Sequence, residues 1–251
     1  MCESEDVQVA IALFPGVSAD ECEAFSLAFD ELMLLGTAVE MIGVGAALGE
    51  VRGPGGGQRV DAVFADVSAP DVVLVPGGLG VDRTAHDDEL LTWLRRVEPG
   101  CQWMAASSTG TVVVAAAGLL GDRPAATHWL AGSMLEEYGS MASSDRIVEV
   151  GHILTCHGHI SAMDVALLII MRLYNRETAA QVRSQLLTGG GGTAVTSDHR
   201  SLMARIRKSA FVVRLAARRT ERRLIRPRNK ELATSDWIEM ELTEEPTRRR
   251  R

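Results

Sequence analysis

Short, continuously apolar runs alternate with segments of helical spacing along most of the chain, and this alternation limits the folds open to it. The first run, Val7 to Phe14, stops at Pro15-Gly16, as a strand buried on both faces does. Ser18 to Leu35 follows with helical spacing and stops at Gly36. Strands separated by helices require crossover connections. We therefore expect a three-layer α/β sandwich around a mainly parallel sheet.

The same pattern continues to residue 187. Further strands are expected at Ala38 to Val44, Asp71 to Val75, Trp103 to Ala106 and, as two short strands about a turn at Gly151-His152, Ile147 to Cys156. Asp61 to Ala65 is ambiguous. Further helices are expected at Asp87 to Val97, Thr109 to Leu120, Ser161 to Tyr174 and Glu177 to Leu187.

Four consecutive glycines, Gly189 to Gly192, end this pattern, and the composition changes beyond them. We expect one domain over residues 1–188, a Gly-rich linker over 189–198 and an Arg-rich tail over 199–251. Residues 1–197 hold 10 Arg, no Lys and 25 Asp or Glu, a net charge of −15, whereas residues 198–251 hold 14 Arg, 2 Lys and 8 acids, a net +8. The acidic body has little to attract a polyphosphate.

One apolar stripe runs through the basic tail: Leu202, Ile206, Val213, Ala217 and Leu224 recur at steps of four and seven residues. This spacing predicts an amphipathic helix that stops at Pro227. Such a helix can bind DNA, an anionic membrane or an acidic protein surface, including the body of this chain or of a second copy. A disordered appendage is the competing expectation.

Composition excludes several classes of protein. With 46% hydrophobic residues, most of the chain can bury enough surface to fold. The longest apolar runs, such as Val165 to Met171, fall short of the ~20 residues that cross a bilayer, so we expect no membrane span. The amino terminus has acids where a secretory signal has basic residues, which favours a cytoplasmic protein. The four cysteines lack CxxC spacing and are expected to be reduced thiols.

Three segments follow predicted strands where open α/β sheets bind their ligands, at the carboxyl ends of the strands. They are Phe14 to Val17, followed by Glu21; Val75 to Gly80; and Ala106 to Gly110. The last is a sharp strand-to-helix turn, which exposes one side chain above the sheet and aims the next backbone N–H groups towards it. A negatively polarised atom could be held there.

Several motifs in this order resemble the ThiJ/PfpI superfamily, of class I glutamine amidotransferase-like fold: FPGV, VPGGLG, DDELLTWLRR, STGTVVVAAAGLLGDRPAATHW and ISAMDVALLIIMRLYNRETAAQV. The similarity runs from about Val7 to Leu187. It is greatest to the branch that contains isonitrile hydratases and the amino-terminal domains of GlxA-like AraC-type regulators. The resemblance implies a flavodoxin-like central sheet, a homodimer, and a small-molecule substrate or ligand without a cofactor or metal.

The family pattern implies roles for residues in the three segments. Glu21 matches its acidic residue, and Ser108 stands where the family has a nucleophilic Cys in a Cys-Thr-Gly context, so that Ser108, Thr109 and Gly110 form the elbow. Gly77 and Gly78 are expected either to make the turn alone or also to present N–H groups, with Gly110, to a substrate oxygen.

Replacing Cys by Ser at the elbow changes the chemistry that is open to the site. A thiol of pKa ~8.5 needs about 4 pKa units, or ~6 kcal/mol, to pass its proton to a carboxylate of ~4.3. A hydroxyl comparable to water needs about 11 units, or ~15 kcal/mol. With Glu21 as its partner, Ser108 is therefore not expected to support thiolate-type chemistry.

A serine nucleophile would need a better base, and the segment Thr155 to His159 offers two. His157 or His159 could serve Ser108 as general base, or both could be loop histidines without a role. The spacing of Cys156 and these histidines is weak evidence for a metal site. His128, in a Thr-His-Trp motif that the branch shares, is expected to pack rather than to catalyse.

Three functions remain open. In the first, the chain is an isonitrile-hydratase-like lyase or related hydrolase in which Glu21 is the acid or base, acting on a bound water, while Ser108 and Thr109 orient the substrate. In the second, it is a pseudo-enzyme that senses a small molecule and conveys the signal through its tail. The third, a serine hydrolase, depends on the two histidines.

Overall fold

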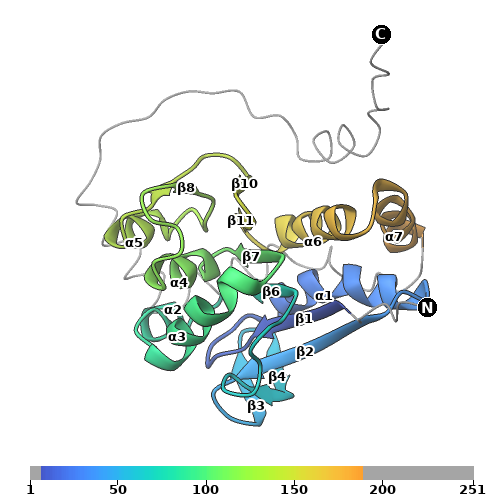
Figure 1. Ribbon diagram of the computed structural model, residues 1–251. Coiled ribbons are helices and arrows are strands. Elements are labelled where there is room, and N and C mark those ends of the chain that lie inside the picture. Colours follow the sequence, from blue (N-terminus) through green and yellow to red (C-terminus); the bar gives the residue numbers. More distant parts are fainter. Residues whose placement is uncertain (1–6, 189–251) are drawn as a thin grey trace.

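A computed structural model describes residues 7–188 (Figure 1). The predicted linker and Arg-rich tail, and the roles considered for them, lie outside the described residues. Within the described range, the expected α/β sandwich with a mostly parallel central sheet is confirmed.

The central sheet has seven strands in the order β10-β11-β7-β6-β1-β2-β5, and every pairing in it is parallel except that of β10 with β11. The five inner strands, β2-β1-β6-β7-β11, follow the flavodoxin-like order. The strands are β1 Val7–Ala12, β2 Val39–Gly45, β5 Ala62–Val63, β6 Val72–Val75, β7 Trp103–Ser107, β10 Ile147–Val150 and β11 Ile153–Cys156.

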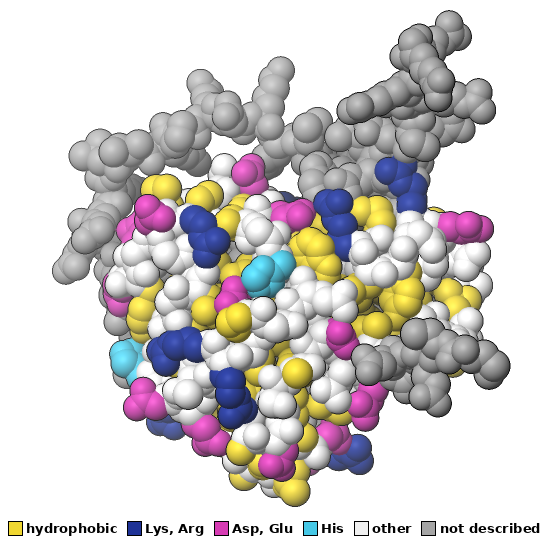
Figure 2. Space-filling view, viewed as in Figure 1, with side chains coloured by type: hydrophobic (Ala, Val, Ile, Leu, Met, Phe, Trp, Pro, Cys, Tyr) yellow, Lys and Arg dark blue, Asp and Glu magenta, His cyan; other side chains and the backbone are white. Residues whose placement is uncertain are grey.

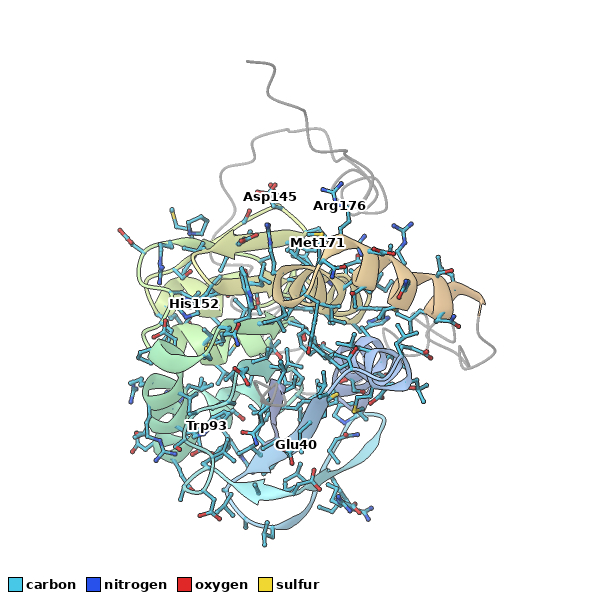
Figure 3. All side chains as sticks on the ribbon, turned by 45° about the vertical axis from the view of Figure 1, so that its right-hand side comes forward. Glu40, Trp93, Asp145, His152, Met171 and Arg176 are labelled. Atoms are coloured by element: carbon cyan, nitrogen blue, oxygen red, sulfur yellow. The ribbon has the colours of Figure 1, made fainter. Side chains whose placement is uncertain are left out.

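Helices cover both faces of this sheet. The helices are α1 Ala19–Leu34, α2 Val81–Thr84, α3 Asp88–Val97, α4 Gly110–Ala116, α5 Gly132–Glu137, α6 His159–Leu173 and α7 Arg176–Thr188, with a 3₁₀ turn at Glu98–Gly100. Helix α1 packs against α6 and α7, whereas α4 packs against α2, α3 and α5. Figure 3 shows the two helical layers apart, with Trp93 on α3 in one and Met171 on α6 in the other. Val72–Val75 of β6, buried between the layers, is part of the core.

The structure corrects several sequence-based boundaries. Helix α4 ends at Ala116 and not at Leu120, because Gly118 takes a φ of +79°, a left-handed conformation that stops a helix before Gly121 is reached. Two pairs of strands were not predicted: the β3–β4 hairpin, Gly49–Gly53 with Gly56–Val60, and β8–β9, Pro124–Ala125 with Met141–Ala142. Their glycine-rich or very short sequences carry no hydrophobic period. Helices α2 and α5 were missed because they are shorter than two turns.

Candidate functional site

The site lies at the switch point of the sheet, where β1 pairs with β2 on one side and with β6 on the other. The loops that follow β1 and β6 meet there: Val17 and Gly78 form an antiparallel bridge, the Leu79 N–H donates to Gly16 O at 2.9 Å, and the Ser18 N–H donates to Gly77 O at 2.9 Å. A side chain at Gly78 would overlap the backbone of Gly16. The VPGG turn therefore needs glycine for this close approach.

Ser108 occupies a strained turn between β7 and α4. It is the one non-glycine residue among the described residues with a positive φ, 55°. Its N–H donates to Cys156 O at 2.8 Å, and its carbonyl accepts the Thr127 hydroxyl at 2.7 Å. These contacts hold the turn in place against a strain of about 1–3 kcal/mol. Backbone strain of this kind concentrates at functional sites. The turn at Ser108 is the strand-to-helix elbow expected from the sequence.

Glu21, on the first turn of α1, points at this elbow. Its Oε2 accepts the Gly77 N–H at 2.9 Å and the Ser107 hydroxyl, and the side chain of Ser108 also hydrogen-bonds the carboxyl group. A Cβ added to Gly77 would lie 2.8 Å from Ser108 Cβ and 3.0 Å from Glu21 Oε2, so these three residues meet without space for a further side chain.

Burial raises the pKa of the Glu21 carboxyl, and the carboxylate of Asp20 adds to the rise. The hydrogen bonds from Ser107, Gly77 and Ser108 act in the opposite direction but are smaller causes. Glu21 is 7% exposed and Ser108 6%. The environment therefore makes Glu21 a weaker acid than an exposed glutamate, so that it holds its proton to a higher pH.

Of the two adjacent serines at the elbow, the sequence analysis named Ser108 as a site residue and missed Ser107. Ser107 is the last residue of β7 and is fully buried, and its hydroxyl reaches Glu21 from the strand side of the elbow. Adjacent identical residues give no indication of which one faces the carboxylate. Side chains alternate between the two faces along a strand, so the orientation of Ser107 could be predicted only if Ser107 was known to belong to the strand. The sequence analysis ended that strand at Ala106.

Thr109 ties the elbow to the β6 loop. Its hydroxyl accepts the Gly78 N–H at 2.8 Å and donates to Gly78 O at 2.9 Å. The N–H groups of Gly77 and Gly78 thus donate to Glu21 and Thr109, and in this state they are not presented to a substrate oxygen. Gly110 begins α4, so its N–H has no acceptor inside the helix.

Two histidines directly follow residues that contact the backbone of Ser108. His157 follows Cys156, whose carbonyl accepts the Ser108 N–H, and His128 follows Thr127, whose hydroxyl donates to Ser108 O. Burial, and then the charge of His157, lower the pKa of His128 to about 4, so its imidazole is neutral at pH 7. The effect of His157 on the pKa of His128 was not foreseen.

His159 is the first residue of α6 and starts the helix beyond this loop. The Ser108 side chain hydrogen-bonds the Glu21 carboxyl group. This contact couples Ser108 to a carboxyl group. The arrangement on which a serine hydrolase depends thus gains no support from the described contacts.

Two buried cysteines flank the site, but neither replaces the missing elbow thiol. Burial, and then the charge of Glu21, raise the pKa of Cys22 to about 12 and that of Cys156 well above its ordinary value. Both stay as thiols at neutral pH, and a thiol is a poor nucleophile. Within residues 7–188, no group of three or more His, Cys, Asp or Glu side chains is arranged to hold a metal ion.

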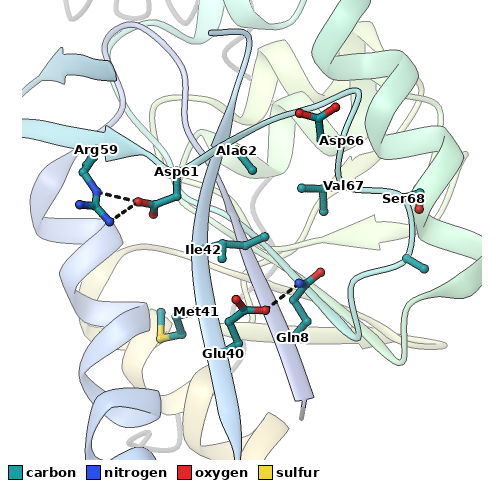
Figure 4. A pocket seen from close by; sticks show the side chains of 11 residues that line it. Gln8, Glu40, Met41, Ile42, Arg59, Asp61, Ala62, Asp66, Val67 and Ser68 are labelled. Atoms are coloured by element: carbon teal, nitrogen blue, oxygen red, sulfur yellow. Dashed lines mark hydrogen bonds and ion pairs between the residues drawn. The ribbon is translucent and has the colours of Figure 1, made fainter. Parts of the chain in front are cut away.

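A hollow of about 710 Å³ lies away from the elbow, at the β5 edge of the sheet (Figure 4). Four of its polar side chains form two pairs: Gln8 Nε2 donates to Glu40 at 2.9 Å, and Arg59 Nε donates to Asp61 at 2.6 Å. None of its lining residues belongs to the elbow. The hollow and the elbow are thus separate features of the structure.

A flavodoxin-like sheet with a strained elbow beside its switch point, faced by a buried carboxyl group, defines an α/β protein of the ThiJ/PfpI type. The chain belongs to the DJ-1/PfpI family, whose model matches residues 7–172. Among solved structures, a ThiJ/PfpI family protein from Pseudomonas syringae superposes with a TM-score of 0.70 at 19% identity, over 85% of this chain and 90% of that chain. Schizosaccharomyces pombe DJ-1 superposes with a TM-score of 0.62 at 17% identity, over 72% of this chain and 98% of that chain.

Curated relatives include enzymes and regulators. Isonitrile hydratase from Pseudomonas putida is 34% identical over 123 residues, which cover 49% of this chain and 54% of that protein. The HTH-type transcriptional regulator CdhR from Pseudomonas aeruginosa is 29% identical over 131 residues, covering 51% of this chain and 39% of that protein. This chain thus spans about half the length, or less, of these relatives.

On the face shown in Figure 2, acidic and basic side chains are interspersed and do not gather into a basic stripe of the kind that follows a nucleic-acid backbone. Within the described part of the chain, no helix is both long and apolar enough to cross a bilayer.

Proposed function

We propose that this protein is a hydratase that adds water to the carbon of a small isonitrile, with Glu21 as its acid–base group. The reaction converts R–N≡C and H₂O into the formamide R–NH–CHO. The observation that carries the proposal is the contact of a buried Glu21, whose pKa is raised, with Ser108 at the strained elbow. The similarity to isonitrile hydratase supports this substrate class.

A protonated carboxyl group suits the electronic structure of an isonitrile, whose terminal carbon carries a lone pair. Glu21 donates its proton to that carbon, forming a C–H bond and leaving a nitrilium cation beside the new carboxylate. Water then attacks the same carbon, and its released proton returns to Glu21. The resulting formimidic acid rearranges to the formamide, so that all atoms balance and Glu21 regains its starting form.

The other elbow residues position the reactants. The Ser108 hydroxyl, hydrogen-bonded to Glu21, can hold the water or the isonitrile next to the acid. Thr109 is a positioning residue, since its two bonds to Gly78 fix the elbow against the β6 loop. Direct attack by water avoids the ~15 kcal/mol needed to pass a serine proton to a carboxylate of ordinary pKa.

Assays of the purified protein with cyclohexyl isonitrile, following the formamide by chromatography, test the proposal. Ser108→Ala is expected to lower kcat/KM by no more than about tenfold, because a positioning hydroxyl contributes roughly the energy of one hydrogen bond. A Ser108→Ala variant that loses about 10⁴-fold or more would mean that Ser108 itself is the nucleophile. Absence of turnover by the unaltered protein would contradict the hydratase proposal.

A second candidate is favoured by the similarity to HTH-type regulators and by the absence of a thiol at the elbow. Here the same site senses a small molecule without transforming it, and a homodimer, as the family resemblance implies, passes on the signal. Saturable binding of an isonitrile or its formamide without turnover, together with a dimer in sedimentation experiments, would favour this candidate over the enzyme.

A further inference from the structure

Strand β2 has an open edge over its first half, away from the elbow. On one side β2 pairs with β1 from Val39 to Val44, whereas on the other side β5 pairs only with Val44 and Gly45. Asp61 replaces a strand partner at Gly43: its carboxylate accepts the Gly43 N–H at 2.9 Å, and its N–H donates to the Gly43 carbonyl at 2.8 Å. Before Gly43, the outer edge of β2 has no partner strand among the described residues.

The register shows which backbone groups face this open edge. The carbonyls of Ala38, just before β2, and of Val44 accept N–H groups from the β1 side. Since the backbone groups of a strand alternate between its two neighbours, the even-numbered residues face β1 and the odd-numbered ones face outwards. The N–H and C=O groups of Val39 and Met41 therefore point outwards, and within residues 7–188 no hydrogen bond pairs them. Such groups are a template for one more strand.

The hollow beside β5 runs along this open edge and is acidic (Figure 4). Glu40 and Met41 of β2 line it, together with Asp61 and Asp66. Its three carboxylates outnumber its single cation, Arg59, which already pairs with Asp61. An added strand would therefore gain from basic side chains.

Charge distinguishes between the occupants of this edge. Two copies of the chain joined here would bring two acidic hollows together, which like-charge repulsion disfavours. Residues 198–251, in contrast, carry a net charge of +8. Their arginines before Pro227 lie in the segment whose spacing predicts a helix, and a helix already pairs its own backbone groups. Arg248 to Arg251 lie beyond that segment as four consecutive basic residues.

The chain is long enough for these arginines to reach β2. Arg248 follows Thr188, the last described residue, by 60 positions. A coil of that length spans roughly 40 Å between its ends, whereas a compact body the size of residues 7–188 has a radius of gyration of only about 16 Å. Because the segment is tethered, its effective concentration at the edge is on the order of millimolar, well above that of a free competitor.

We propose that Arg248 to Arg251 add an extended strand to the free edge of β2. The new strand pairs with the backbone groups of Val39 and Met41, and its guanidinium groups lie against the acidic hollow. This contact covers an edge that would otherwise be open to pairing with other chains. It is independent of the reaction at the elbow.

Hydrogen exchange of the full chain, read by NMR at single amides, tests this pairing because an added strand engages the Met41 N–H. The tail variant carries Arg248→Gln, Arg249→Gln, Arg250→Gln and Arg251→Gln together. At low ionic strength, the Met41 amide should exchange at least about tenfold more slowly in the unaltered chain than in the tail variant, the effect of about one hydrogen bond. Equal exchange in the two proteins would overturn the proposal.

A second set of arginines provides the matched control. Arg218→Gln, Arg219→Gln, Arg222→Gln and Arg223→Gln together remove the same charge from the segment that is predicted to be helical. This variant should keep the slow exchange of Met41. An equal loss of protection in the two variants would mean that the tail acts through its overall charge, and would contradict the assignment to Arg248 to Arg251.

Substitutions in the hollow test the contact from the side of the body. Glu40→Gln with Asp66→Asn removes two carboxylates from the hollow and should speed the exchange of Met41 as the tail variant does. Glu23→Gln with Asp122→Asn changes two exposed acids that do not line the hollow, and should leave that exchange as it is. Equal exchange in the two double variants would contradict the role of the acidic hollow.

Two further readings of the same spectra complete the test. The Ile42 N–H faces β1, so its exchange should be alike in all variants if β2 itself stays folded. Slow exchange of Met41 should not depend on protein concentration, because the segment belongs to the same chain. Protection that rises with concentration would overturn the proposal and assign the edge to a second copy.

Discussion

Glu21→Gln is expected to lower kcat/KM for an alkyl isonitrile by about 10²- to 10⁴-fold, the range that the loss of a general acid costs. Glutamine has the same shape, and its amide oxygen can still accept the Gly77 N–H and the Ser107 hydroxyl. It has no acidic proton to give to the isonitrile carbon. The measurement is the initial rate of formamide formation at several isonitrile concentrations.

Glu23→Gln provides the control for this substitution. Glu23 is an exposed residue on the same helix, two positions from Glu21, and is not part of the elbow. Its variant should keep the activity and the melting temperature of the unaltered protein. If Glu21→Gln is folded and as active as Glu23→Gln, the carboxyl proton has no part in the reaction.

Ser108→Cys is expected to raise kcat/KM by at least about tenfold, because it adds a thiolate route that the serine lacks to the direct attack by water. A thiol needs about 4 pKa units to pass its proton to a carboxylate, whereas a hydroxyl needs about 11. The thiol would take the place of the hydroxyl, since the contacts with Cys156 and Thr127 that hold the elbow are made by the backbone of residue 108. Activity and the rate of alkylation of the new thiol, measured across pH, check the result.

The neighbouring serine gives a direct comparison. Ser107→Cys also puts a thiol near Glu21, but from the end of β7 and not from the strained turn. It should bring no gain in activity. Equal effects of the two substitutions would mean that the strained turn gives a thiol at position 108 no better access to the substrate than a thiol at position 107 has.

Much of the fold could be predicted because apolar runs and turn residues agree along the chain. Val7 to Phe14 and Asp71 to Val75 predicted β1 and β6 to within two residues. The helix expected at Asp87 to Val97 is α3, and Asp87 caps it by accepting the N–H groups of Glu89 and Leu90. The β3–β4 hairpin could not be predicted, because Gly49 to Val60 has no alternation of apolar residues. Its stability comes from contacts with β2 and α1.

The site could be predicted in part. The sequence predicted that the segment containing Gly16 and Glu21 meets the elbow segment, because each of these segments follows a buried strand. The contribution of Ser107 depends on where β7 ends, and the approach of His128 to His157 depends on two loops far apart in sequence. Such contacts arise from tertiary packing, for which a single sequence carries no local pattern.

The protonation of Glu21 is the property on which the mechanism depends, and it can be measured directly by following the carbon-13 signal of the Glu21 carboxyl group across pH. Burial is expected to place its pKa above the ordinary value of about 4.3. Because the acid form is the active one, kcat/KM should fall as pH rises through that same pKa. A carboxyl group that titrates at or below about 4.3, or a rate that rises through its titration, would contradict the account.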